Sequence, residues 1–389
     1  MVVSDMQIAR LPEVAQIIMG QSPPSDTYNE VGNGLPFFQG KAEFGEVSPI
    51  PRKWCANPKK IAEAGDILIS VRAPVGPTNL AVERCCIGRG LAAIRADANR
   101  LNLEYLRFFL RYAEPMLASM GQGSTFAAIG RTELASISMQ LPPLDEQRRI
   151  VDIISRAEGI VRLRREAQNK TAEITPSLFI DMFGDPLTNP KELPRVELGR
   201  FLSFITSGSR GWAKYYSPEG DRFIRSLDVR MNSISDESAV FVNAPLGAEA
   251  DRTRVLVDDV LLTITGSQIG RVAPVLENLA GAFVSQHVAI LRLKSDLSPK
   301  FLSMYLSLET GGQREIARLQ YGQTKPGLSL QQIPKFMLLV PSIMLQNKFA
   351  DKLEQLQSIQ SQQSAATAKA EATFNALLSR AFQGGLGLP

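Results

Sequence analysis

The chain has 389 residues, is 44% hydrophobic, and carries a formal net charge of +4 with a sequence pI of 8.9. A domain takes roughly 100 to 200 residues, so this length predicts at least two hydrophobic cores. The charge is short of the strong excess that marks a stand-alone nucleic-acid binder.

Cysteine and histidine are too scarce for a disulfide framework or a zinc site. The chain has three cysteines, Cys55, Cys85 and Cys86, and one histidine, His287. No signal-peptide core is visible at the N-terminus, and no apolar run approaches the roughly 20 residues that span a bilayer. We therefore expect a soluble protein in a reduced, cytoplasmic setting, with no membrane partner.

In the first half, polar side chains follow apolar runs at predicted turns. Gly20–Pro24 is rich in turn residues, and Leu35–Phe38 reads as a strand that ends at Gln39 and Lys41. A glutamine amide can bond two edge atoms of adenine, and a lysine can reach guanine or phosphate. A plain strand end is the structural alternative, and neither interpretation excludes the other.

A turn followed by a β-rich run recurs in both halves. Ala64–Arg72 places Arg72 at a strand end, and Val257–Gly266 matches it, with Arg271 at the following turn. The apolar residues of these runs fit buried strands. The polar residues at the ends of these runs, at the loops, are the candidates for function.

Helix starts are predicted at Asn102 and at Ser298, which can cap the first turn with their side chains. Each helix is followed by a glycine-bounded stretch, Gly121–Thr125 and Tyr321–Lys325. Small polar side chains on such loops can contact phosphates. A simple connecting turn is the alternative.

A long helix is predicted after Pro142 and Pro143, which end the preceding segment. It extends to Phe183, before a stretch with glycine and two prolines. A narrow apolar stripe recurs along it at steps of three and four residues and suits a partner helix. The stripe consists of Ile150, Ile154, Ala157 and Val161.

The same order returns near the C-terminus, where Pro341 and Gln346 precede a second long amphipathic run. Aligning Gln147 with Gln346 gives a shift of 346 − 147 = 199 residues, which also places Phe183 on Phe382. One half of the chain thus repeats the other, and we expect two similar domains. We also expect the first stripe to pack against the residues Leu353, Leu356 and Ile359.

The second half keeps the frame but changes the polar residues. Arg222–Arg230 takes roughly the place of Phe38–Lys41. This pattern suggests two domains that recognise two different targets, although divergence after a duplication would give a similar pattern.

The sequence lacks the motifs of several enzyme classes. It has no GxxxxGK[ST] loop, no Asp/Asn-Pro-Pro-Tyr/Phe tetrapeptide and no convincing acidic cluster near a lysine. A single histidine also weakens any general-base proposal. Binding is the simpler interpretation.

With these motifs and this repeat, the chain resembles the specificity subunit of type I restriction-modification systems. The matches are Gly-Gln-Ser-Pro at Gly20–Pro23, Gln-Gly-Lys at Gln39–Lys41, Gly-Asp-Ile-Leu-Ile-Ser at Gly65–Ser70, Gly-Ser-Thr at Gly123–Thr125, and Leu-Pro-Pro-Leu-x-Glu-Gln at Leu141–Gln147. The second half departs from the pattern, because Met344-Leu345-Gln346 replaces the acidic pair.

The resemblance implies an α+β fold with two similar α/β target-recognition domains, each followed by a long helix. The two helices would pack as an antiparallel coiled coil with a pseudo-two-fold repeat. The implied boundaries are 1–144 for the first recognition domain, 145–183 for the first helical spacer, 184–341 for the linker and second recognition domain, and 342–389 for the second spacer and tail.

The resemblance also implies a non-catalytic adaptor that reads a split, asymmetric double-stranded DNA target. Its partners would be two methyltransferase subunits and the restriction subunits. S-adenosylmethionine, ATP and Mg²⁺ would bind in those partners, with no cofactor or metal in this chain. Alternatives are a single-chain methyltransferase or nuclease with degenerate motifs, and a scaffold that does not touch DNA.

The candidate DNA-binding residues all lie in predicted turns, strand ends or glycine-bounded loops. They are Gln21, Ser22, Gln39, Lys41, Arg72, Gln122, Ser124, Thr125, Arg225, Arg230, Gln268, Arg271, Gln323, Thr324 and Lys325.

Overall fold

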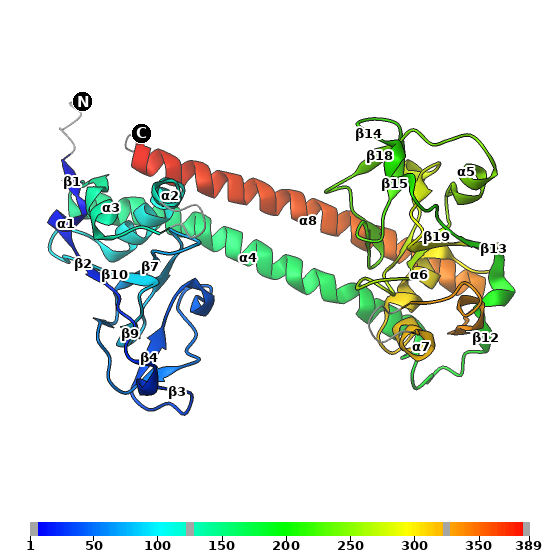
Figure 1. The fold of residues 1–389 in the computed structure, drawn as a ribbon, viewed down its shortest axis with the longest axis horizontal. Helices are drawn as coiled ribbons and strands as arrows, with labels where there is room; N and C mark the ends of the chain where they lie inside the picture. The colour runs from blue at the N-terminus through cyan, green and yellow to red at the C-terminus, as the bar shows by residue number, and fades with distance from the viewer. Residues whose placement is uncertain (1–6, 122–127, 322–326, 384–389) are drawn as a thin grey trace. The chain divides into compact units, whose positions relative to one another are not determined.

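A computed structural model describes residues 7–121, 128–321 and 327–383 and confirms the α+β class. The chain forms two compact units (Figure 1). Unit 1 comprises residues 1–165 and 365–389, and unit 2 comprises residues 166–364. In the part of the chain that is described, no helix is long and apolar enough to cross a membrane.

Unit 1 is built on a four-stranded antiparallel sheet with the order β2-β10-β7-β8. Its strands are β2 (Ala15–Met19), β10 (Leu91–Ala96), β7 (Ile67–Ser70) and β8 (Thr78–Leu80). All four residues of β7 are buried, since Ile67 and Ile69 face one apolar cluster and Leu68 faces another. The strand predicted within Ala64–Arg72 is confirmed.

A second sheet in unit 1 has five short strands in the order β3-β5-β4-β9-β6 and includes a parallel pair, in which Phe38 of β4 lies opposite Ile87 of β9. Its strands are β3 (Tyr28–Asn29), β5 (Trp54–Cys55), β4 (Leu35–Phe38), β9 (Cys85–Ile87) and β6 (Ile61–Ala62). The remaining elements are β1 (Ile8–Arg10), which pairs with β11 (Ser138–Gln140), and the helices α1 (Leu11–Val14), η1 (Ser25–Thr27), η2 (Lys41–Glu43), α2 (Leu103–Met120) and α3 (Arg131–Ser136).

Unit 2 repeats this arrangement with a four-stranded antiparallel sheet of order β13-β22-β19-β20. Its strands are β13 (Leu202–Ser207), β22 (Val288–Leu293), β19 (Val260–Thr263) and β20 (Val272–Pro274). A second sheet of order β14-β18-β15-β21 again contains a parallel pair, with Ile224 of β15 opposite Val284 of β21. Ile224 thus takes the place of Phe38, within the segment Arg222–Arg230 that the sequence placed roughly at Phe38–Lys41.

The other elements of unit 2 include the four strands of the second sheet and two separate two-stranded pairs, β12 with β23 and β16 with β17. The strands are β12 (Arg195–Glu197), β14 (Tyr216–Ser217), β15 (Asp221–Ile224), β16 (Val229–Arg230), β17 (Ser233–Ile234), β18 (Val240–Val242), β21 (Phe283–Val284) and β23 (Met337–Leu339). The helices are η3 (Leu198–Phe201), η4 (Trp212–Tyr215), α5 (Ala248–Thr253), η5 (Glu277–Leu279), α6 (Pro299–Ser307), α7 (Gly312–Leu319) and η6 (Ile333–Lys335).

A buried aspartate precedes the central strand of each main sheet. Asp66 accepts two hydrogen bonds of 2.8 Å from the Arg95 guanidinium, and Asp259 accepts two of 2.8 Å from Arg292. Both aspartates are about 1% exposed. The aspartate in the Gly-Asp-Ile-Leu-Ile-Ser motif therefore has a structural role that sequence reasoning did not assign.

The predicted helix caps are confirmed, because Asn102 Oδ1 accepts a hydrogen bond from Tyr105 N, and Ser298 Oγ accepts one from Phe301 N. The repeated glutamines explain why each long helix begins where it does. Gln147 Oε1 accepts a 2.7 Å bond from the backbone N–H of Asn102, and Gln346 Oε1 accepts a 2.8 Å bond from that of Ser298. Both glutamines are fully buried, so each fastens a long helix to a cap on its own unit.

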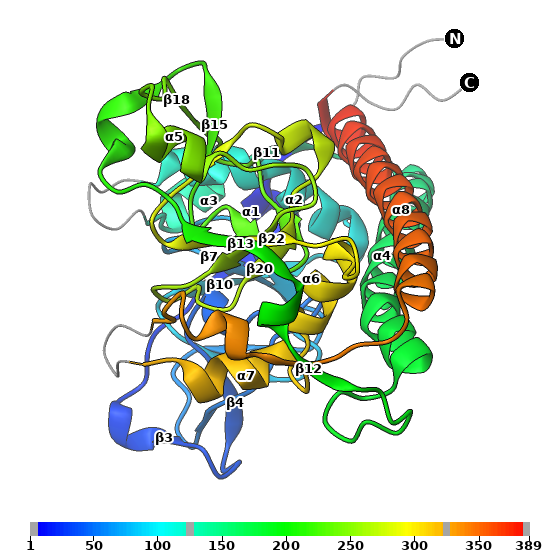
Figure 2. The same cartoon turned by 90° about the vertical axis from the view of Figure 1, so that its right-hand side faces the viewer.

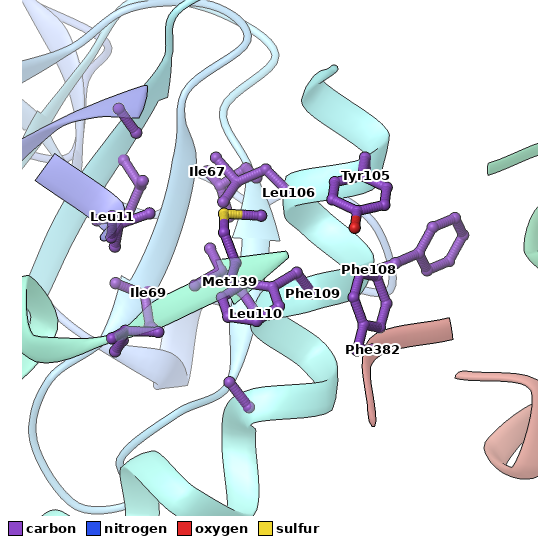
Figure 3. Packing of buried hydrophobic residues seen from close by; sticks show 14 of the residues in the cluster. Leu11, Ile67, Ile69, Tyr105, Leu106, Phe108, Phe109, Leu110, Met139 and Phe382 are labelled. Atoms are coloured by element: carbon purple, nitrogen blue, oxygen red, sulfur yellow. The ribbon is translucent and has the colours of Figure 1, made fainter. Parts of the chain in front are cut away.

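The first long helix, α4 (Leu144–Phe183), ends where the sequence predicted, and the second, α8, runs from Ile343 to Gln383. In unit 1, Ile150 and Ile154 near the start of α4 share one apolar cluster with Leu378 and Phe382 near the end of α8. Figure 3 shows Phe382 beside the aromatic residues of α2, and its ring centroid lies 5.2 Å from that of Tyr105.

In unit 2 the roles of the two helices are exchanged. Phe183 at the end of α4 lies 5.0 Å, between ring centroids, from Phe301 of α6, and 5.4 Å from Phe349 near the start of α8. Helix α6 lies between the sheet and the two long helices (Figure 2). The shift of 199 residues that relates Phe183 to Phe382 therefore relates two helix ends that fill the same kind of core.

The predicted packing stripe is only partly right. Ile150, Ile154 and Val161 are buried in unit 1 and Ala157 packs on the same cluster, while Leu353 is buried in unit 2 and Leu356 is half-buried. The expectation that the two sets pack on each other is wrong, because the start of α4 meets the end of α8.

Ile359 is a second correction, since it is 47% exposed. On α8, the half-buried Leu356 is followed four residues later by Gln360. The Nε2 of Gln360 donates to the carbonyl of Thr171 on α4 at 3.1 Å. Ile359, three residues after Leu356, therefore lies outside this contact face and is exposed to solvent.

Candidate nucleic-acid interface

Three turns of unit 1 meet at one end of its main sheet. The backbone N–H of Arg89 donates to Ser22 Oγ at 3.3 Å, in the turn that contains Gln21. A Cβ atom added to Gly90 would lie 2.3 Å from the carbonyl oxygen of Gln39, so only glycine permits this approach. The structure thus brings Gln21, Ser22 and Gln39 together around Arg89.

Arg89 is the residue that sequence reasoning missed. It is exposed and, among the described residues, forms no ion pair. The available signal was its position between two glycines, Gly88 and Gly90, immediately after an apolar strand. Glycines that allow close backbone contact leave an arginine side chain as the projecting group of the turn.

Lys41 and Arg72 are also exposed, Lys41 at the start of η2 and Arg72 just after β7. No ion pair occupies either side chain in the described part of unit 1. Exposed cations without an acidic partner attract phosphate and can donate to base edges.

In unit 2 the corresponding loops line a cavity of about 830 Å³. The polar residues in its lining include the predicted Gln268 and several that were not predicted: Arg210, Ser226, Arg252, Thr265, Gln286 and His287. Gln286 Nε2 lies 3.1 Å from His287 Nε2, and the other ring nitrogen of His287 is hydrogen-bonded to Thr265 Oγ1. The lining is therefore rich in hydrogen-bond donors, and its charged residues are Arg210, Arg252 and Glu249.

Matched backbone hydrogen bonds show that these loops hold equivalent places. Gln21 N donates to Ile87 O at 3.0 Å in unit 1, and Ser209 N donates to Val284 O at 3.1 Å in unit 2. On this correspondence Gln39 matches Arg225, because each directly follows the strand residue that pairs in parallel with the same neighbour.

Arg225 nevertheless differs from Gln39, because its guanidinium is already hydrogen-bonded to a carboxylate of the protein. It donates to both oxygens of Asp228, at 3.1 and 2.9 Å, and Asp228 is 2% exposed. These hydrogen bonds raise the pKa of Arg225 above its ordinary value. A base contact by Arg225 would require this ion pair to break.

Two further predicted residues in the described part of unit 2 do not line this cavity. Arg230 is half-buried in the hairpin of β16 and β17, and Arg271 is half-buried in the turn between β19 and β20, with a buried Nη1. Six further candidates lie outside the described residues: Gln122, Ser124, Thr125, Gln323, Thr324 and Lys325.

The ion pair makes a direct prediction for Arg225. Arg225→Ala removes the guanidinium from the buried Asp228, which keeps the backbone N–H of residue 225 at 2.8 Å and, at 3.6 Å, Nη1 of Arg222. We expect a loss of about 1–3 kcal/mol in the free energy of unfolding, measured by urea denaturation. Arg230→Ala, which removes no ion pair among the described residues, is the control. Equal stability of the two variants would contradict the structural role.

Comparison with known proteins shows what the segment that carries the unit 1 loops is similar to. Residues 3–173 match the family model of the type I restriction modification DNA specificity domain. Over 155 residues, 40% of the chain, the sequence is 43% identical to the putative type I restriction enzyme MjaX specificity subunit of Methanocaldococcus jannaschii. That alignment spans 36% of the relative, so the chain covers about a third of its length.

Two further matches extend over nearly the whole chain. The type I restriction enzyme MjaVIII specificity subunit of the same organism is 18% identical over 373 residues, which is 91% of this chain and 87% of the relative. The crystal structure of the type I restriction-modification system S subunit from M. genitalium covers 98% of both chains at 14% identity with a TM-score of 0.56, which shows a shared fold. Residues 3–173 thus match the type I restriction modification DNA specificity domain, and the chain is similar to specificity subunits of type I restriction enzymes.

Proposed function

We propose that this chain is the DNA sequence-recognition subunit of a type I restriction-modification complex and reads a split, asymmetric target with two domains. The observation that carries the proposal is the repetition of one frame with different projecting side chains. The same order of the main sheet and the same loop contacts recur in both units, yet the positions of Gln39 and Arg89 in unit 1 carry Arg225 and Gln286 in unit 2.

We further propose that residues 1–144 and 184–341 are the two recognition domains, and that residues 145–183 and 342–389 form an antiparallel coiled-coil spacer. The shared core of the start of α4 with the end of α8, and the reverse in unit 2, supports this pairing. Helix α4 has 40 residues, and a helix of that length is about 60 Å long. A turn of duplex is about 34 Å long, so the helices have the length needed to set a spacing.

In this proposal the chain is an adaptor without catalysis of its own. Two methyltransferase subunits and the restriction subunits would dock on it, and S-adenosylmethionine, ATP and Mg²⁺ would act in those subunits. The alternatives are a single-chain methyltransferase or nuclease, and a scaffold without DNA contact. Methylation or cleavage of DNA by the purified chain alone would favour the first alternative. The absence of sequence-dependent DNA binding by the assembled complex would favour the second.

Exchange of one domain tests the proposal. We expect that replacing residues 1–144 by the corresponding domain of a relative changes one half of the methylated sequence and leaves the other half intact, because unit 2 keeps its own loops. The readout is the methylated motif in a genome that expresses the chimera with its partners. A chimera with residues 184–341 exchanged is the matched control and should change only the other half. Simultaneous change of both halves would contradict two independent readers.

A further inference from the structure

One turn holds the same place in both units but carries different base-reading chemistry. Val71 N donates to Gly90 O at 3.0 Å in unit 1, and Ile264 N donates to His287 O at 2.9 Å in unit 2. The residue before each acceptor is Arg89 in unit 1 and Gln286 in unit 2. A guanidinium and an amide therefore project from equivalent positions.

We propose that this turn, residues 88–90 in unit 1 and 285–287 in unit 2, sets one base of each half of the target. Arg89 selects guanine and Gln286 selects adenine. The inference rests on the proposed function, and it goes further by naming the specificity-determining residue of each unit and the base that it reads.

Arg89 meets the requirements for a guanine contact. Its side chain is exposed and has no ion-pair partner within the described ranges, so the fork of N–H groups is available to the O6 and N7 acceptors of guanine. Its backbone is held by Ser22 on one side and by the close approach of Gly90 to Gln39 on the other. A fixed backbone limits the ordering that binding would otherwise require.

Gln286 meets the requirements for an adenine contact. One of its two amide N–H groups points to His287 Nε2 at 3.1 Å, which leaves the second N–H for adenine N7 and the carbonyl oxygen for the adenine amino group. With Nε2 as the acceptor, the proton of His287 lies on Nδ1 and is donated to Thr265 Oγ1. His287 is thus a positioning residue that orients the amide.

The test is a reciprocal substitution, Arg89→Gln and Gln286→Arg, made separately in the full chain. Each variant is assembled with its methyltransferase subunits, and bound duplexes are selected from a randomised DNA library and sequenced. We expect Arg89→Gln to change one guanine of the first half to adenine, and Gln286→Arg to change one adenine of the second half to guanine. A bidentate contact gives roughly 5- to 150-fold preference for its base.

Two further variants separate base reading from charge and from folding. Arg89→Lys keeps the charge without the fork, so we expect affinity to fall less than the preference for guanine. Arg84→Gln is the matched control, because Arg84 belongs to the same unit but pairs with Glu63 at 3.3 Å, and it should leave the selected sequence unchanged.

An unchanged base preference in both reciprocal variants would overturn this inference while leaving the proposed function intact. So would an equal loss of affinity for all sequences in both, which indicates phosphate contacts. If the complex with the unaltered chain selected no sequence, the proposed function itself would fail.

Discussion

Ile154→Asp should destabilise unit 1 by more than about 4 kcal/mol, because an unpaired carboxylate would lie in an apolar core. Ile154 is fully buried in the cluster that joins α4 to α2 and to the end of α8. Each unit contains one tryptophan, Trp54 in unit 1 and Trp212 in unit 2, so fluorescence during urea denaturation reports the two units separately. We expect the transition seen by Trp54 to move to lower urea, with a smaller change at Trp212.

Ile359→Asp is the matched control for this substitution, since the same side chain is exchanged at a position that is 47% exposed. Its effect should stay within about 0.5 kcal/mol. Each tryptophan is read alone after replacing the other by phenylalanine. Equal shifts for Ile154→Asp and Ile359→Asp would show that the burial of Ile154 is not what stabilises unit 1.

Arg95→Leu should lower the free energy of unfolding by about 3–5 kcal/mol, because it leaves the buried Asp66 carboxylate without its charged partner. Asp66 is 1% exposed and also accepts a 2.8 Å hydrogen bond from Glu63 N, so it cannot turn to solvent without breaking the turn before β7. The measurement is the urea midpoint reported by Trp54.

Arg84→Leu in the same unit is the control for Arg95→Leu, since the pair of Arg84 and Glu63 has side chains that are 59% and 48% exposed. An exposed pair contributes about 0–1 kcal/mol. Arg292→Leu tests the repeat, because Asp259 is buried in the same way and the loss should then appear at Trp212. Equal midpoints for Arg84→Leu and Arg95→Leu would contradict the stabilising role of the buried pair.

Sequence patterns predicted the elements that local physics determines. The ends of α4, the strand within Ala64–Arg72 and the caps at Asn102 and Ser298 follow from proline, glycine and side-chain oxygen chemistry close in the chain. The repeat was visible because Gln147 and Gln346 make the same contacts in their units. Each side-chain oxygen accepts from the backbone N–H of the helix cap, and each Nε2 donates to a proline carbonyl.

What the sequence did not predict depended on contacts and burial that only the folded chain determines. Ile359 was misplaced because steps of three and four residues are both compatible with an apolar stripe, and the partner helix decides between them. The ion pair of Arg225 was not predicted, because nothing in the order of residues shows that Asp228 is buried beside it. Arg89 was missed because its environment is formed by Ser22 and Gln39, which are far from it in sequence.

Because the end of α8 completes the core of unit 1, the helices also determine the order in which the two units can finish folding during synthesis. The core of unit 1 includes Phe374, Leu378 and Phe382, which leave the ribosome long after the strands and α2 that they cover. Until then Tyr105 and Phe108 lack their aromatic partners from α8, although domains generally begin to fold as they emerge. Translation of unit 1 therefore begins first, yet its core is completed only after the whole of unit 2 has been made.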